Sequence, residues 1–136
     1  MTDTKGNWWD AFPAPRSEVP TLERKTALAQ LSSPELLLID VRRTDYEGGT
    51  VRGSLNIPAH SFYLNRAVLY DIVKRAGIKK VAFYCGARSA KWFADFLHDK
   101  EDTSIESYIL EGGIKGWVAA GDEYIKAIDG YEADKW

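Results

Sequence analysis

The single cysteine, Cys85, is the residue with the clearest capacity for chemistry. It ends an apolar run at 80–85 that predicts a strand, and a predicted helix at 89–97 follows closely. Ligands of open α/β sheets bind at the carboxyl ends of strands, and a helix N-terminus there offers unpaired N–H groups and partial positive charge. Such groups bind anions and favour a thiolate, which could attack the sulfur of thiosulfate or the phosphorus of a phosphate ester.

Positive charge follows the cysteine in the chain, at Arg88 and Lys91. The candidate site has Cys85 as its catalytic residue, and the substrate-binding candidates are Gly86, Ala87, Arg88, Ser89 and Lys91. We expect the Cys85 thiol to have a pKa below the ~8.5 of a free cysteine. Unpaired cysteines are also among the most buried residues, so a thiol packed inertly in the strand end is the alternative.

Strands and helices alternate around this segment. The apolar runs at 36–41 and 80–85 lack polar–apolar alternation, which is typical of strands covered on both faces of a parallel sheet. Further strands are predicted at 51–57 and 105–110, and helices at 21–31, 66–76, 89–97 and 114–119. We therefore expect an α/β fold with a mainly parallel sheet of about five strands and helices on both faces.

Length and composition indicate one globular domain. The 136 residues are 45% apolar and 28% charged with a net charge of −2, which argues against nucleic acid or anionic membrane as partners. No apolar run approaches the ~20 residues of a membrane span, and the first residues lack an apolar signal segment, so we expect a cytoplasmic protein. We expect residues 1–20 to form an irregular aromatic arm packed on a domain at 21–136.

The cysteine count limits covalent and metal chemistry. One cysteine excludes an internal disulfide, and with only His60 and His98 beside Cys85 a structural zinc site is not expected. We expect neither a metal nor an organic cofactor.

Three motifs, in this order along the chain, resemble the rhodanese-like domain family. Residues 38–42 and 46–58 match the first half of that domain, and 110–117 match its Gly-Gly-x-x-x-Trp motif. Cys85 lies between them, where the active-site cysteine of the family belongs. The resemblance covers residues 21–120. It is most similar to small fungal rhodanese-like proteins, which are related to rhodanese-fold cell-cycle phosphatases and yeast-type arsenate reductases.

The resemblance implies a thiosulfate-type sulfurtransferase. Cys85 would attack the outer sulfur of thiosulfate, hold a persulfide, and pass the sulfur to cyanide or to a thiol such as glutathione or a redoxin. The alternatives are phosphatase or arsenate reductase chemistry at the same cysteine, and a catalytically silent module that binds a protein partner. For arsenate reduction, glutathione or a redoxin would have to reduce the oxidised thiol, because no second cysteine is present.

The candidate loop departs from the family pattern. The sulfurtransferases carry an arginine five positions after the cysteine and the phosphatases six positions after it, where this chain has Ala90 and Lys91. The arginine of this segment, Arg88, comes three positions after the cysteine, and Thr50 stands where many relatives have histidine. Either the loop is truly short, which favours weak or lost activity, or a glycine-rich stretch between Gly86 and Arg88 is missing from this chain.

The remaining motif residues are expected to be structural. Asp40 and Arg42 should form hydrogen bonds or an ion pair that braces a turn, with Glu47 as a further partner of Arg42. Trp117 should close the core. The glycines should adopt backbone conformations that other residues resist, at positions 48, 49, 112 and 113.

Overall fold

The computed structural model describes residues 6–136, and its centre is a five-stranded parallel sheet. The strands lie in the order β1 (Thr21–Leu22), β6 (Glu106–Leu110), β5 (Lys80–Tyr84), β2 (Leu36–Asp40) and β4 (Leu55–Asn56). The two apolar runs form β2 and β5, which are neighbours inside the sheet. Both are covered on both faces, as their lack of alternation predicted.

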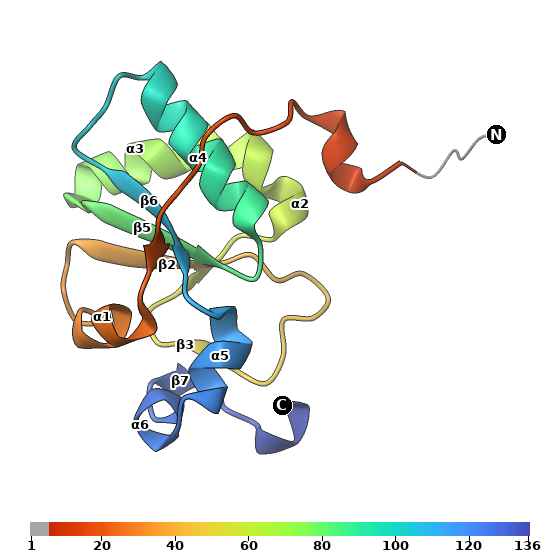
Figure 1. Ribbon diagram of the computed structural model, residues 1–136, viewed down its shortest axis with the longest axis vertical. Helices are drawn as coiled ribbons and strands as arrows, with labels where there is room; N and C mark the ends of the chain where they lie inside the picture. The colour runs from red at the N-terminus through yellow and green to blue at the C-terminus, as the bar shows by residue number, and fades with distance from the viewer. Residues whose placement is uncertain (1–5) are drawn as a thin grey trace.

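Helices cover both faces of the sheet (Figure 1). One face carries α2 (Ala59–Phe62), α3 (Arg66–Ala76) and α4 (Ala87–Asp99), and the other carries α1 (Arg24–Ala29) and α5 (Gly113–Ala119), followed by α6 (Asp122–Ile125). Side chains of β5 alternate between the two cores: Phe83 packs with α4, and Tyr84 packs toward Trp117 of α5. Trp117 is fully buried, as expected. The predicted fold class is confirmed.

Two predicted elements differ from the structure. Residues 21–31 do not form one helix, because Leu22 pairs with Leu110 in the sheet and α1 begins only at Arg24. The segment 51–57 is not one strand. It contains the end of β3 (Thr50–Val51), a tight turn and β4. Strand β3 leaves the main sheet to pair antiparallel with β7 (Ile128–Asp129).

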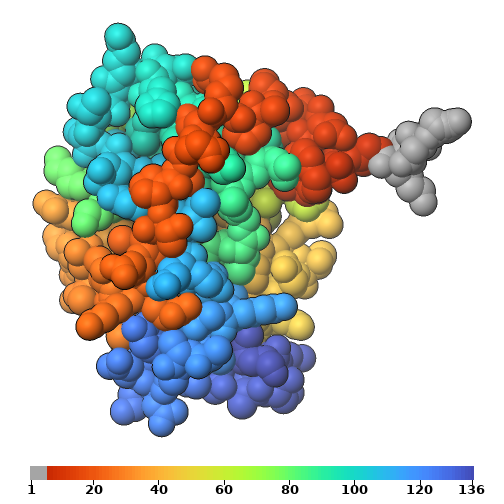
Figure 2. Space-filling model, in the orientation of Figure 1, coloured from red at the N-terminus to blue at the C-terminus, as the bar shows by residue number. Residues whose placement is uncertain are grey.

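The segment before β1 lies across α4, as Figure 2 shows. Residues 8–11 form a short 3-10 helix, and Trp8, Trp9 and Phe12 pack against the α4 core. Trp92 Nε1 donates a hydrogen bond to the carbonyl of Pro13 (2.8 Å), and Ser17 Oγ donates one to Asp95 (2.5 Å). The first five residues of the predicted arm lie outside the described residues.

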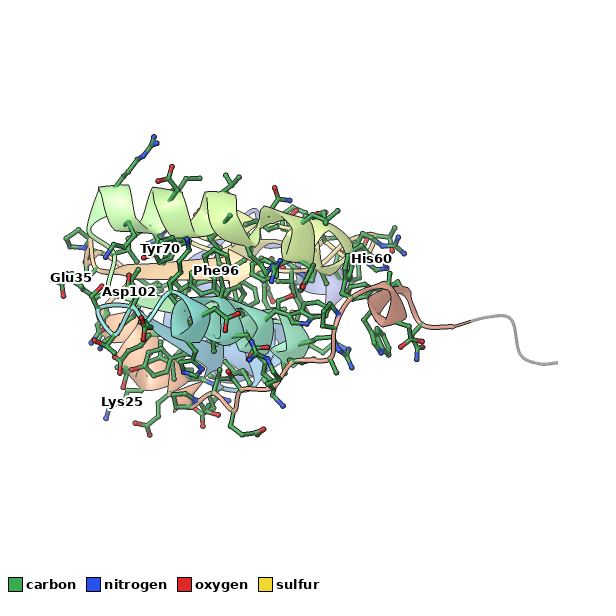
Figure 3. The ribbon with its side chains drawn as sticks, turned by 90° about the horizontal axis from the view of Figure 1, so that it is seen from above. Lys25, Glu35, His60, Tyr70, Phe96 and Asp102 are labelled. Atoms are coloured by element: carbon green, nitrogen blue, oxygen red, sulfur yellow. The ribbon has the colours of Figure 1, made fainter. Side chains whose placement is uncertain are left out.

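At the end of the sheet opposite His60, Tyr70 of α3 is hydrogen-bonded to Asp102, which follows α4. Figure 3 shows Tyr70, Phe96 and Asp102 there. The Tyr70 hydroxyl donates to Asp102 (2.6 Å), and hydrogen bonds from Ser104 and Tyr70 lower the pKa of Asp102. This network is structural and leaves the opposite end to the candidate site. Over residues 6–136, no helix is long and apolar enough to cross a membrane.

Candidate functional site

Cys85 lies directly after β5 and is exposed. Its φ is +72°, in the left-handed region that side-chain-bearing residues rarely adopt, so the chain turns sharply as the strand ends. This turn carries the thiol out of the sheet at its carboxyl edge, where parallel α/β folds bind ligands. The alternative of a thiol packed inside the core is therefore wrong.

The connection between β5 and α4 is only two residues long. Gly86 is the N-cap of α4, and the helix begins at Ala87. A Cβ on Gly86 would lie 2.9 Å from Val41 Cγ2, so a glycine fits here because of close packing. Gly86 alone separates Cys85 from the helix. The connection is as short as the spacing of Cys85 and Arg88 in the sequence requires.

Cys85 opens onto two cavities. The smaller, about 430 Å³, lies between the N-terminal 3-10 helix and the start of α4. The larger, about 890 Å³, lies between α5 and the C-terminal residues. Their shared lining residues are Arg42, Asp45 and Cys85.

Five of the six predicted site residues come together in the smaller cavity: Cys85, Gly86, Ala87, Arg88 and Ser89. The Arg88 guanidinium stacks on the Trp9 ring, 4.1 Å from its centroid. Lys91 lies outside both cavities, and its Nζ is 3.7 Å from a carboxylate oxygen of Glu18. The predicted binding role of Lys91 therefore has no support from its position.

Aromatic and imidazole groups complete the smaller cavity. Trp8 stacks on His60 with ring centroids 4.3 Å apart, beside the 3-10 helix in Figure 3. Burial and the positive charge of Arg43 lower the pKa of His60. Its Nδ1 is buried and has no hydrogen-bond partner among the described residues.

The cation beside Cys85 is Arg42, which sequence reasoning assigned only to the turn. Its Nη2 lies 2.7 Å from Asp40 Oδ2, and both side chains are almost completely buried. Arg42 also donates to the carbonyls of Glu47 (2.9 Å) and Gly49 (2.6 Å). The predicted turn-bracing ion pair is confirmed, but the Glu47 contact uses its backbone and not its carboxylate. The Asp-x-Arg spacing at a strand end was the available signal.

A hydroxyl network lies behind this ion pair. Thr50 Oγ1 donates to Asp40 (2.9 Å) and lies 2.7 Å from the Tyr84 hydroxyl, which donates to Ser54 (2.7 Å). Burial and the nearby Asp40 charge raise the pKa of Tyr84 far above its usual value. Thr50 is therefore part of the structural support of Asp40.

The electrostatics at the sulfur differ from the prediction. Partial burial between the cavity walls raises the pKa of the Cys85 thiol above its ordinary value, with smaller contributions from Asp40 and Asp45. A hydrogen bond from the backbone N–H of Ile114 and the charge of Arg42 oppose this increase. The predicted low pKa is wrong, because desolvation of the thiol outweighs the N–H donor and the positive charge that oppose it.

Metal chemistry has no ligand set here. Within residues 6–136, no group of three or more histidine, cysteine, aspartate or glutamate side chains could hold a metal ion.

The chain is similar to a protein of known sequence and to several solved structures. A tRNA uridine(34) hydroxylase of Erwinia tasmaniensis is 33% identical over 89 residues, which is 63% of this chain but only 25% of that protein. Among solved structures, the Saccharomyces cerevisiae protein Ygr203w, a tyrosine phosphatase of the rhodanese family, matches with a TM-score of 0.70 and 21% identity. That match covers 89% of this chain and 99% of the yeast chain.

A Lactobacillus plantarum protein matches with a TM-score of 0.53 and 19% identity, over 74% of this chain and 82% of its own. These structural matches show a shared fold. The model of the rhodanese-like domain matches residues 23–120, which include Asp40, Arg42, Cys85 and the Gly112–Gly113 turn. The chain therefore belongs to the rhodanese-like domain family.

Proposed function

We propose that the protein is a thiosulfate-type sulfurtransferase that carries sulfur as a persulfide on Cys85. The observation that carries the proposal is the exposed thiol at the junction of two cavities. The Ile114 N–H and the Arg42 charge favour negative charge on the sulfur and offset part of the effect of burial. A persulfide adds one sulfur atom, for which the cavities leave room.

The reaction needs two displacements and no cofactor. The Cys85 thiolate attacks the outer sulfur of thiosulfate, the sulfur–sulfur bond of thiosulfate breaks, and sulfite leaves with the bonding electron pair. The persulfide then holds the negative charge on its outer sulfur. An acceptor nucleophile attacks that sulfur, and Cys85 leaves as a thiolate, ready for the next cycle. Glutathione and a redoxin are the acceptor thiols that we propose.

Phosphate or arsenate chemistry is the second candidate, suggested by the yeast phosphatase with the same fold. It needs several donors around three oxygens as charge develops on them. In this chain α4 starts two residues after Cys85, and Lys91 pairs with Glu18. Arg88 therefore remains as the loop cation, so sulfur transfer, which needs fewer oxyanion donors, fits the site better.

Turnover assays separate these functions and the silent-module alternative. With thiosulfate and cyanide we expect thiocyanate to form, and we expect Cys85→Ser to abolish it because a serine hydroxyl cannot form a persulfide. Hydrolysis of an aryl phosphate that also depends on Cys85 would favour the phosphatase. Absence of both activities from the wild type would favour a protein-binding module.

A further inference from the structure

The two cavities at Cys85 are walled by opposite ends of the chain. Trp8 and Trp9 line the smaller cavity, and Lys135 and Trp136 line the larger. Both ends lie outside residues 23–120, which match the family model. The common fold therefore supplies the sulfur-bearing residue, and the chain's own terminal segments shape the approach to it from either side.

The smaller cavity suits a small anion. At about 430 Å³, it has Arg43 and Arg88 in its wall in addition to the paired Arg42. Arg88 is held against Trp9, so its guanidinium has a fixed place in that wall. The carboxylate in the lining is Asp45. An excess of arginine favours a compact dianion such as thiosulfate.

The larger cavity has a different chemistry. It has about twice the volume, and apolar side chains of α5 form part of it, among them Ile114 and Val118. The charged residues of its lining, other than Arg42, comprise two of each sign: Lys115, Lys135, Asp45 and Glu47. This mixture suits a ligand that carries both an ammonium group and carboxylates on a partly apolar frame, as a short peptide does.

The wall that the C-terminal residue contributes is anchored. Trp136 Nε1 donates a hydrogen bond to the carbonyl of Gly48 (3.0 Å), and the Arg42 guanidinium lies 5.9 Å from its ring centroid. The Arg42 guanidinium also lies 4.9 Å from the Tyr46 ring. The indole is thus tied to the structural ion pair beside Cys85, which fixes the mouth of this cavity relative to the sulfur.

We propose that the larger cavity is the entrance for the sulfur acceptor, a small peptide thiol carrying both ammonium and carboxylate groups, while the donor anion enters through the smaller cavity. This inference rests on the proposed function. The acceptor thiolate attacks the outer persulfide sulfur, takes that atom with it as an acceptor persulfide, and leaves Cys85 as a thiolate. Sulfur thus crosses from one cavity to the other on Cys85.

The test follows discharge of preloaded protein. Inorganic polysulfide transfers one sulfur to Cys85 and leaves as a polysulfide one sulfur shorter, so loading does not depend on thiosulfate. Discharge by glutathione is compared with discharge by cyanide, which is too small to need the larger cavity. Ala119→Trp fills that cavity from its α5 wall, and Ala120→Trp adds the same bulk at the adjacent exposed residue outside the lining.

With glutathione, we expect Ala119→Trp to slow discharge by about tenfold or more and Ala120→Trp to leave it unchanged. Discharge by cyanide should be unchanged in both variants. Lys115→Glu should slow glutathione by about fivefold without affecting cyanide. Equal rates for Ala119→Trp and wild type with glutathione, or equal slowing of glutathione and cyanide, would overturn the proposal. If polysulfide loads Cys85 with sulfur but thiosulfate does not, the proposal that thiosulfate is the donor is contradicted. The comparison of glutathione with cyanide on the polysulfide-loaded protein still tests the proposed acceptor entrance.

Discussion

Arg42 Nη2 and Asp40 Oδ2 lie 2.7 Å apart in an ion pair whose two side chains are only 4% and 0% exposed. Arg42 Nε also donates to Asp40, and Nη1 and Nη2 donate to the backbone carbonyls of Glu47 and Gly49 in the turn that follows. The arginine whose charge acts on the Cys85 thiol is therefore part of the structural framework. Its charge opposes the rise in the pKa of the Cys85 thiol, while Nε, Nη1 and Nη2 each donate to groups of the fold.

Removing the Asp40 charge should destabilise the protein strongly. Asp40→Asn leaves the buried Arg42 guanidinium without its counter-ion, and we expect the free energy of unfolding to fall by about 3–5 kcal/mol in urea titrations. Asp129→Asn is the matched control, because Asp129 pairs with Arg52 on the exposed surface at 3.5 Å. That change should cost less than ~1 kcal/mol. Similar small losses in both variants would show that the buried pair is not needed.

Substituting two glycines near this turn distinguishes the cost of steric crowding from the cost of an unfavourable backbone conformation. Gly49 and Gly53 both have positive φ, +107° and +80°. A Cβ on Gly49 would lie 2.8 Å from the carbonyl oxygen of Asp129, and nothing lies within 4 Å of one on Gly53. Gly53→Ala should cost about 1–2 kcal/mol from its backbone conformation alone. Thermal unfolding should show a clearly larger loss for Gly49→Ala, and equal losses would contradict the close packing of β3 on β7.

Much of the fold was predictable because local pattern and burial agreed. The continuous apolar runs that became β2 and β5 identify buried parallel strands, and the helix at 66–76 ends at Gly77 with φ +73°, as expected of a C-terminal glycine. The errors occurred in short elements. Leu22 carries the same apolar signal in a two-residue strand as in a helix, and its pairing with Leu110 is a contact between distant parts of the chain.

The candidate site was predictable in its position but not in its electrostatics. The strand–cysteine–helix order placed Cys85 correctly. The orientation of Arg88 and Lys91 depends on Trp9 and Glu18, which lie more than 70 residues earlier in the sequence. No local pattern reports such contacts. The larger cavity could not be predicted for the same reason, because it is lined by α5 together with C-terminal residues that are distant from Cys85 in the sequence.

The raised pKa of Cys85 predicts an alkaline dependence of its reactivity. Since only the thiolate reacts, the rate of alkylation by iodoacetamide should keep rising with pH beyond the range in which a free cysteine has levelled off. The native protein should be compared with the same protein in denaturant, where the thiol titrates near ~8.5. A native rate that levels off at lower pH than the denatured one would contradict the raised pKa of Cys85.

Arg88 should matter for the donor and little for the fold. Arg88→Ala removes a guanidinium from the smaller cavity, and we expect the KM for thiosulfate to rise by about five- to tenfold. Trp9→Ala should give part of this increase and Trp9→Phe less, because a phenyl ring retains the stacking face for Arg88. Arg75→Ala, which breaks an exposed pair with Asp71, serves as the control. An unchanged KM in Arg88→Ala would remove the donor role of that cavity.

The central claim, a sulfur atom held on Cys85, is tested most directly by the mass of the intact protein after exposure to thiosulfate and removal of excess reagent. The account predicts a gain of one sulfur atom, confined on peptide mapping to the segment that contains Cys85. Cys85→Ser should show no gain, and a thiol should reverse the gain in the wild type. An unchanged mass for the folded wild-type protein, with its thiol still open to alkylation, would contradict the account.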